Sequence, residues 1–179
     1  MSLDELVGHY PPPTQPKDNE VDWNAYERRM GFMPPKYFRD FIGVYGDSTW
    51  FDTLRIVYTP AQSEEQLDQY VDLLKLKSSQ MEGNIYSAKP FEQITPRLFP
   101  EEKGLLAIAI DFSSSIYCWD TKDKDPETWP IVYWQTGALH VFENATIDGL
   151  ILDWINRKSR MVELFCDFND VDPQMLVVG

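Results

Sequence analysis

The sequence GLLAIAIDF at residues 104–112 constrains the fold of this chain more than any other stretch. Every residue from 105 to 110 is apolar, so the run lacks the alternation of a strand that has one face in water. A strand of this kind is buried on both faces, as the central strands of a sheet are. SSSIYCWDT follows at 113–121 and predicts a second strand that returns antiparallel to the first.

Helices and strands are predicted on both sides of this hairpin, and their order indicates the fold class. The expected strands cover residues 53–60, 105–112, 115–121, 131–135 and 138–142, and the expected helices cover 23–31, 34–46, 63–79 and 147–158. Asp22 and Thr146 are placed to cap helix starts, and Gly31 and Gly46 are placed to end helices. Helices, then locally joined strands, then a closing helix predict an α+β domain with a mainly antiparallel sheet.

The length of 179 residues suits one domain. Residues 9–22, HYPPPTQPKDNEVD, are rich in proline and polar residues, which favours an extended conformation. We therefore divide the chain into a proline-rich leader over residues 1–21 and a single domain over residues 22–179.

The charge of the chain limits its partners. There are 29 acidic against 16 basic residues, which gives a formal net charge of -13. Direct binding to nucleic acid needs a positive charge on the protein, so it is not expected here. A basic protein partner is favoured instead, although an acidic surface also serves solubility. No secretory signal opens the sequence and no apolar run is long enough to span a membrane, so we expect a cytoplasmic protein.

A catalytic site can be assembled on paper from Cys118, His140 and either Asp111 or Asp120. A nucleophilic cysteine needs a neighbouring base and a lowered pKa. Cys118 instead stands in the middle of a predicted strand between two aromatic residues, which favours a small buried side chain. We therefore expect packing at Cys118 and no enzymatic activity.

Metal binding is not indicated either. His9 and His140 are the two histidines of the chain, and no metal-ligand spacing includes them. Asp123, Asp125 and Glu127 alternate as calcium ligands do, but the loop lacks the central glycine of a calcium-binding loop. A solvated acidic loop is the favoured interpretation, and no metal or cofactor is expected.

The serines of the hairpin have a structural interpretation. Asp111 can accept hydrogen bonds from the backbone amides of Ser113 or Ser114, as aspartates do in turns. These three residues are predicted to form the turn.

Three stretches together resemble the SUKH superfamily in its Smi/Knr-like branch. AYERRMGFMPPKYFRDFIGVYGD (25–47) is similar to the family's two-helix signature, and LFPEEKGLLAIAIDFSSSIYCWDT (98–121) is similar to its hairpin. PIVYW (130–134) and TIDGLILDWI (146–155) complete the order, so the resemblance covers roughly residues 22 to 158. The chain departs from the family in using serines where glycines are usual, and in its longer helix at 63–79.

The resemblance implies a SUKH-like α+β fold without catalytic residues. Bacterial members of the family are immunity proteins that bind and block a toxin made in the same cell, often a nuclease or deaminase, and the fungal relatives are regulatory adaptors. For a toxin-binding surface we select the acidic loop, whose candidate residues are Asp120, Asp123, Asp125, Glu127 and Trp129. The alternative for Trp129 is that its ring folds onto the sheet. The chain is expected to be a monomer or a weak dimer.

Overall fold

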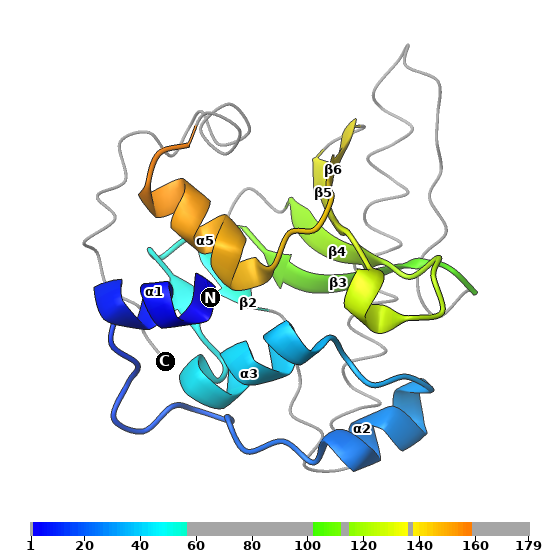
Figure 1. The fold of residues 1–179 in the computed structure, drawn as a ribbon, viewed down its shortest axis with the longest axis horizontal. Coiled ribbons are helices and arrows are strands. Elements are labelled where there is room, and N and C mark those ends of the chain that lie inside the picture. Colours follow the sequence, from blue (N-terminus) through cyan, green and yellow to red (C-terminus); the bar gives the residue numbers. More distant parts are fainter. Residues whose placement is uncertain (1, 57–101, 112–114, 136–137, 159–179) are drawn as a thin grey trace.

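A computed structural model describes residues 2–56, 102–111, 115–135 and 138–158 of the chain. Within these ranges, six strands form one sheet in the order β1-β2-β3-β4-β5-β6, and every neighbouring pair is antiparallel (Figure 1). The strands are Thr49–Trp50 (β1), Leu54–Ile56 (β2), Leu105–Ile110 (β3), Ile116–Asp120 (β4), Ile131–Gln135 (β5) and Ala138–Phe142 (β6). The predicted α+β fold with an antiparallel sheet is confirmed.

The predicted central hairpin is β3 and β4, which occupy the middle of the sheet. The first five residues of β3 are buried, as expected for a strand with both faces covered. The register of β3 against β4 shifts between Ala107 and Ala109, where β3 has one extra residue. Such a bulge turns the residues beyond it by one position, so Leu106 and Ala109 come to the same face.

The helices begin and end at the residues that cap them. The α-helices in the described ranges are Ser2–His9 (α1), Trp23–Met30 (α2), Lys36–Tyr45 (α3) and Ile147–Ile155 (α5). The Asp22 carboxylate accepts from the amide of Ala25, and the Thr146 hydroxyl accepts from the amide of Gly149. Gly31 ends α2 in the left-handed conformation that favours glycine. The predicted caps are confirmed, while the predicted helix at 63–79 lies outside the described residues.

Helices α3 and α5 cover the face of the sheet on which Tyr117 and Trp119 lie. The ring of Phe38 in α3 packs edge-on against Trp119 with centroids 4.8 Å apart. From α5, Leu150 and Ile151 line a small apolar cavity together with Tyr117. These rings and aliphatic side chains form the core between the sheet and the helices.

The first residues of the predicted leader pack against the domain. Ser2–His9 forms a helix, α1, which lies beside α5 (Figure 1). Leu6 is completely buried in the core, and the Ser2 hydroxyl donates to the buried carboxylate of Asp148 in α5. The apolar side chains of α1 bury their surface on α5, which is why the segment does not project into solvent. The boundary at residue 21 itself remains a prediction.

Residues 10–22 connect α1 to α2 without a helix or strand of their own, and we call residues 10–19 the strap. The carbonyl of Tyr10 accepts from the hydroxyl of Tyr45 at 2.7 Å, and the carbonyl of Lys17 accepts from the amide of Asp47 at 2.8 Å. A Cβ on Gly46 would lie 2.0 Å from the Lys17 carbonyl oxygen, closer than atoms can approach. Gly46 also has φ 62° and ψ -149°, a conformation that side chains other than glycine rarely adopt. Glycine at 46 therefore lets the strap cross the end of α3.

The first prediction concerns Gly46 and its matched control in the same helix. Gly46→Ala is expected to cost about 2 kcal/mol or more of unfolding free energy, because the new methyl group meets the strap in a strained backbone. Gly43→Ala should instead gain about 0.5–1 kcal/mol, since beyond the adjacent backbone of its own helix no atom lies within 4 Å of its added Cβ, and alanine favours helices. Chemical denaturation of both variants measures the difference, and equal changes at the two positions would contradict the strap geometry.

The second prediction concerns alkaline pH. Burial, with a smaller contribution from the charge of Asp148, raises the pKa of Tyr45 to about 12 from its ordinary value of 10.0. Burial likewise raises the pKa of Tyr26 and of Tyr37. The folded state thus holds these protons more tightly than the unfolded chain, so stability is complete below pH 10.0 and falls as the pH rises toward 12.

An alkaline titration that follows phenolate absorbance and circular dichroism together measures this effect. We expect the buried phenols to ionise as the fold is lost, because ionised Tyr45 has no proton to donate to the strap. Complete tyrosine ionisation near the ordinary pKa with unchanged dichroism would contradict the prediction. The chain unfolded in denaturant supplies the reference titration.

Candidate functional site

The acidic loop lies between β4 and β5 and is ordered by its own side chains. The Asp123 carboxylate accepts from the amide of Asp125 at 2.9 Å, and the Asp125 carboxylate accepts from the amide of Glu127 at 3.0 Å. This second bond caps the single 3-10 turn Pro126–Thr128 (η1), and the Thr128 hydroxyl donates back to the Asp125 carbonyl. Aspartate side chains satisfy nearby amides in this way in many turns. The loop is therefore held in one conformation while Asp123 and Asp125 stay exposed.

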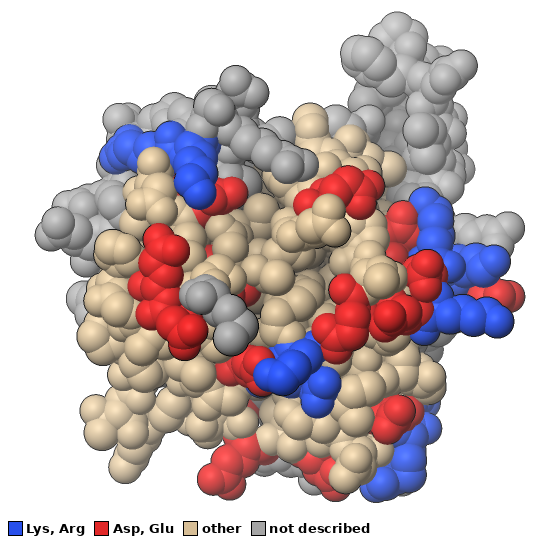
Figure 2. All heavy atoms as spheres, in the orientation of Figure 1, with Lys and Arg blue, Asp and Glu red and all other residues tan. Residues whose placement is uncertain are grey.

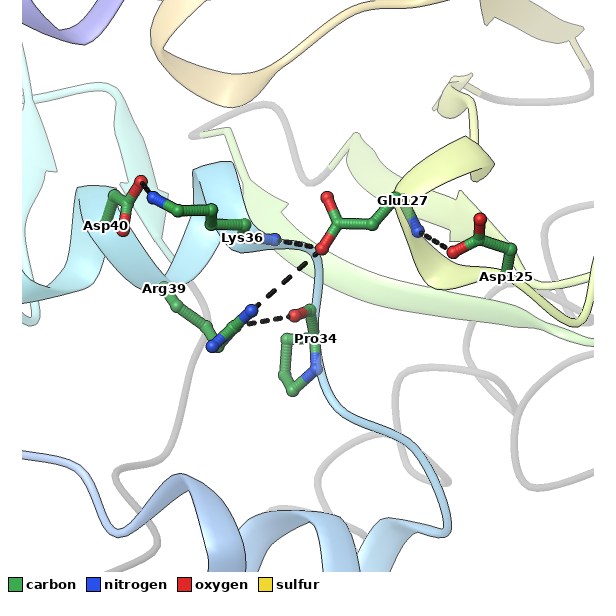
Figure 3. Close-up of polar contacts among 6 residues, drawn as sticks. All are labelled: Pro34, Lys36, Arg39, Asp40, Asp125 and Glu127. Carbon is green, nitrogen blue, oxygen red and sulfur yellow. Dashed lines mark hydrogen bonds and ion pairs between the residues drawn. The ribbon is translucent and has the colours of Figure 1, made fainter.

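Glu127 reaches out of the loop to the start of α3 (Figure 3). One oxygen of its carboxylate accepts from the amide of Lys36 at 2.7 Å and lies 4.0 Å from the Arg39 guanidinium. Pro35 occupies the N-cap position of α3 and supplies no side-chain acceptor. A carboxylate from elsewhere in the chain therefore satisfies the first amide of this helix and meets the positive end of its dipole.

Trp129 is buried and does not stand exposed on the surface of the loop. Its side chain is 6% exposed, and its ring packs edge-on against Phe32 with centroids 4.9 Å apart. The indole NH donates to the carbonyl of Asp123 at 2.7 Å. The sequence left open whether this ring folds onto the sheet, and the structure has it folded in beside Trp119. Burial of an indole costs no hydrogen bond when its NH has an acceptor in the protein. The buried ring of Trp129 therefore attaches the loop to the core.

Asp120 ends β4 and presents little of its carboxylate to solvent. The side chain is 14% exposed, and one oxygen accepts from the Lys122 ammonium at 2.7 Å. The other oxygen is buried and has no hydrogen-bond partner among the described residues. Of the five predicted binding residues, the structure brings Asp123, Asp125 and Glu127 together as exposed carboxylates, and it separates Asp120 and Trp129 from that group by burial. A role in toxin binding remains a prediction.

Charge on the surface is distributed rather than confined to this loop. Figure 2 shows acidic side chains in several groups on one face of the molecule, one of them over the η1 turn, with basic side chains between them and at the margin. The net charge of -13 thus gives a broad negative field rather than one isolated patch. Such a field acts on the approach of a basic partner from many directions.

The suggested pairing of Cys118 with His140 is not formed. Residues directly opposite each other in a sheet share a face. Cys118 lies opposite Val132, which lies opposite Val141, whereas His140 lies opposite Tyr133. His140 and Cys118 therefore project from opposite faces of the sheet, as successive positions along a strand do.

The Cys118 thiol also lacks the environment of a nucleophile. It is 2% exposed, and burial raises its pKa, which disfavours the reactive thiolate. His140 instead packs its ring against Tyr133. The geometry agrees with the interpretation of Cys118 as a packing residue.

Asp111 joins the two ends of the β3–β4 connection. One oxygen of its buried carboxylate accepts from the amide of Ser115 at 2.9 Å, and the Asp111 amide donates to the Ser115 carbonyl at 3.0 Å. Tyr133 donates its hydroxyl to the other oxygen at 3.3 Å. Ser113 and Ser114 lie outside the described residues, so their part in the turn remains a prediction.

Other kinds of site have little support in the described part of the chain. No three histidine, cysteine or acidic side chains there are close enough to hold a metal ion together. None of the described helices combines the length and the apolar character that crossing a lipid bilayer requires. The cavity under α5 is small and almost wholly apolar in its lining.

Sequence reasoning missed the cap that Glu127 provides to α3. The signal was indirect, because a helix that begins after two prolines has no side-chain cap of its own and needs an acceptor from elsewhere. Nothing local indicates which of the acidic residues supplies it. Glu127 lies 91 positions from Lys36 along the chain.

Comparison with known proteins identifies a family. A model of the SMI1 / KNR4 family (SUKH-1) matches residues 19–157, which is more than half of the chain. No curated protein and no solved structure matches it.

The third prediction tests the burial of Trp129. Trp129→Ala is expected to cost about 3–5 kcal/mol of unfolding free energy, because it leaves a cavity beside Phe32 and Trp119. Lys124→Ala, an exposed change in the same loop, should stay within about 0.5 kcal/mol of the wild type. Chemical denaturation compares the two variants. If Trp129→Ala cost no more than Lys124→Ala, the ring would be exposed in solution and available as an anchor.

Proposed function

Because the chain belongs to the SMI1 / KNR4 family (SUKH-1), we propose that it is a non-enzymatic immunity protein, which binds a toxin made in the same cell and neutralises it. The match over residues 19–157 carries this proposal. The family is compatible with immunity proteins and with regulatory adaptors of the Smi/Knr type. The acidic character of the chain favours the first of these roles.

The arrangement of Cys118 and His140 supports the non-enzymatic part of the proposal. Acyl-transfer chemistry needs a nucleophile and a base within hydrogen-bonding reach of each other. Here the two side chains lie on opposite faces of the sheet. The protein acts by binding.

The charge supports a basic toxin as the partner. A nuclease or deaminase that acts on nucleic acid needs a positively charged face for the phosphate backbone. An acidic protein can cover such a face, and its field speeds the encounter. The net charge of -13 and the exposed carboxylates of the acidic loop fit this role. In the proposal the protein works in the cytoplasm as a monomer or weak dimer, without direct contact to nucleic acid or membrane.

The acidic loop is the proposed contact surface. Its side-chain hydrogen bonds and its buried tryptophan hold the exposed carboxylates in place before a partner arrives. A surface that is ordered in advance loses less conformational entropy on binding. Asp123 and Asp125 can then attract basic side chains and meet them without rearrangement.

Co-expression tests the function directly. The protein should rescue cells from the toxin encoded beside its gene, and it should form a complex with that toxin in pull-down experiments. A regulatory adaptor would behave differently, with several cellular partners and no rescue. Failure to rescue cells from the adjacent toxin would remove the immunity proposal.

The fourth prediction tests the contact surface through association rates. Asp123→Asn, Asp125→Asn and Glu127→Gln together should slow association with the toxin, most strongly at low salt, because they remove charge and keep the hydrogen-bond acceptors. A control with Glu5→Gln, Asp52→Asn and Glu143→Gln removes the same charge from three exposed positions elsewhere. Surface plasmon resonance at several salt concentrations measures both. Equal slowing in the two triple variants would place the contact surface outside the acidic loop.

A further inference from the structure

We infer that Glu127 is a positioning residue, which sets the place of the acidic loop by capping α3 and leaves Asp123 and Asp125 to face a partner. This inference rests on the proposed binding function of the loop. Of the three exposed acids of the loop, Glu127 holds the loop against α3, whereas Asp123 and Asp125 contact the partner.

The first amide of α3 needs a hydrogen-bond acceptor, and the Glu127 carboxylate supplies it. Pro35 precedes the helix and accepts through its carbonyl from Phe38 and Arg39, but it has no side-chain acceptor for the first amide. The amide of Lys36 therefore donates to Glu127. The Arg39 side chain donates through Nε to the carbonyl of Pro34 at 2.9 Å, which places its guanidinium beside the same carboxylate (Figure 3).

The loop side of this contact connects Glu127 to the two outer acids. Its own amide donates to the Asp125 carboxylate, and the Asp125 amide donates to the Asp123 carboxylate. The carbonyl of Asp123 accepts from the indole of Trp129, which is buried against the core. The loop is thus attached to the rest of the molecule by the Thr121 hydroxyl, which donates to the Gly104 carbonyl, by the buried indole of Trp129 and by the carboxylate of Glu127. Of these contacts, the one from Glu127 is made by the η1 turn, so its loss frees that turn and the two acids bonded to it.

A positioning role and a contact role predict different results for two substitutions. Glu127→Gln removes the charge but keeps an oxygen that can accept from Lys36. Glu127→Ala removes both the charge and the acceptor. If Glu127 only contacts the partner, loss of its charge makes both variants equally harmful. If Glu127 positions the loop, Glu127→Gln keeps the hydrogen-bond acceptor that Glu127→Ala removes, and Glu127→Ala is the more harmful variant.

The first experiment uses the free protein and needs no partner. Amide hydrogen exchange by NMR should show the Lys36 and Glu127 amides exchanging about fivefold faster or more in Glu127→Ala, the loss typical of a removed helix cap. Glu127→Gln should keep both amides close to their wild-type protection. Glu143→Ala, at an exposed acid outside the loop, should change neither amide. Unchanged exchange in Glu127→Ala would overturn the inference.

The second experiment measures binding to the toxin encoded beside the gene. Glu127→Ala should raise the dissociation rate, because a freed loop must be ordered again in every complex. Glu127→Gln should lower the association rate modestly through its lost charge and leave the dissociation rate unchanged. Equal dissociation rates in the two variants, both above the wild type, would make Glu127 a contact residue and overturn the inference. Absence of any complex with the wild type would count against the proposed function alone, since the exchange experiment tests the cap independently.

Discussion

The indole of Trp119 is the point on which the rest of the structure depends. It lies in the middle strand β4, is 1% exposed, and donates its NH to the hydroxyl of Tyr37 at 2.6 Å. Phe38 packs on one part of the ring, and Trp129 lies beside it with centroids 6.0 Å apart. One side chain therefore joins the sheet, α3 and the acidic loop. A large aromatic ring can do this because it buries much apolar surface and still offers a directed donor.

Helix α3 is held at both ends by segments that are distant in the sequence. Glu127 caps its first amide, and the strap crosses its end at Gly46, where the Lys17 carbonyl accepts from the amide of Asp47. A helix of ten residues has little stability of its own in water, so such tertiary contacts decide whether it forms. The same contacts place the acidic loop at one end of α3 and the leader at the other. Order in the loop is thereby coupled to the core.

Family membership and geometry support different parts of the functional proposal. Membership in the SMI1 / KNR4 family (SUKH-1) is compatible with a binding role of the immunity or adaptor kind. The geometry adds that Cys118 and His140 lie apart, and that the exposed acids of the loop are ordered by hydrogen bonds. A shared fold does not specify a partner. The proposal of a basic partner rests instead on charge, which acts at long range.

The sequence by itself determined the elements whose causes are local. The apolar run at 105–110 predicted a central strand, and Asp22 predicted a helix start three residues before the amide that it caps. Patterns of this kind predict the structure because the interacting residues are neighbours in the chain. The sequence also indicated the acidic loop, but it could not show that Trp129 is buried or that Glu127 serves α3. The burial of Trp129 depends on Phe32, and the cap depends on a residue 91 positions away. Only the tertiary structure decided these points, because the free energy of burial and of a hydrogen bond depends on which distant groups the fold brings into contact.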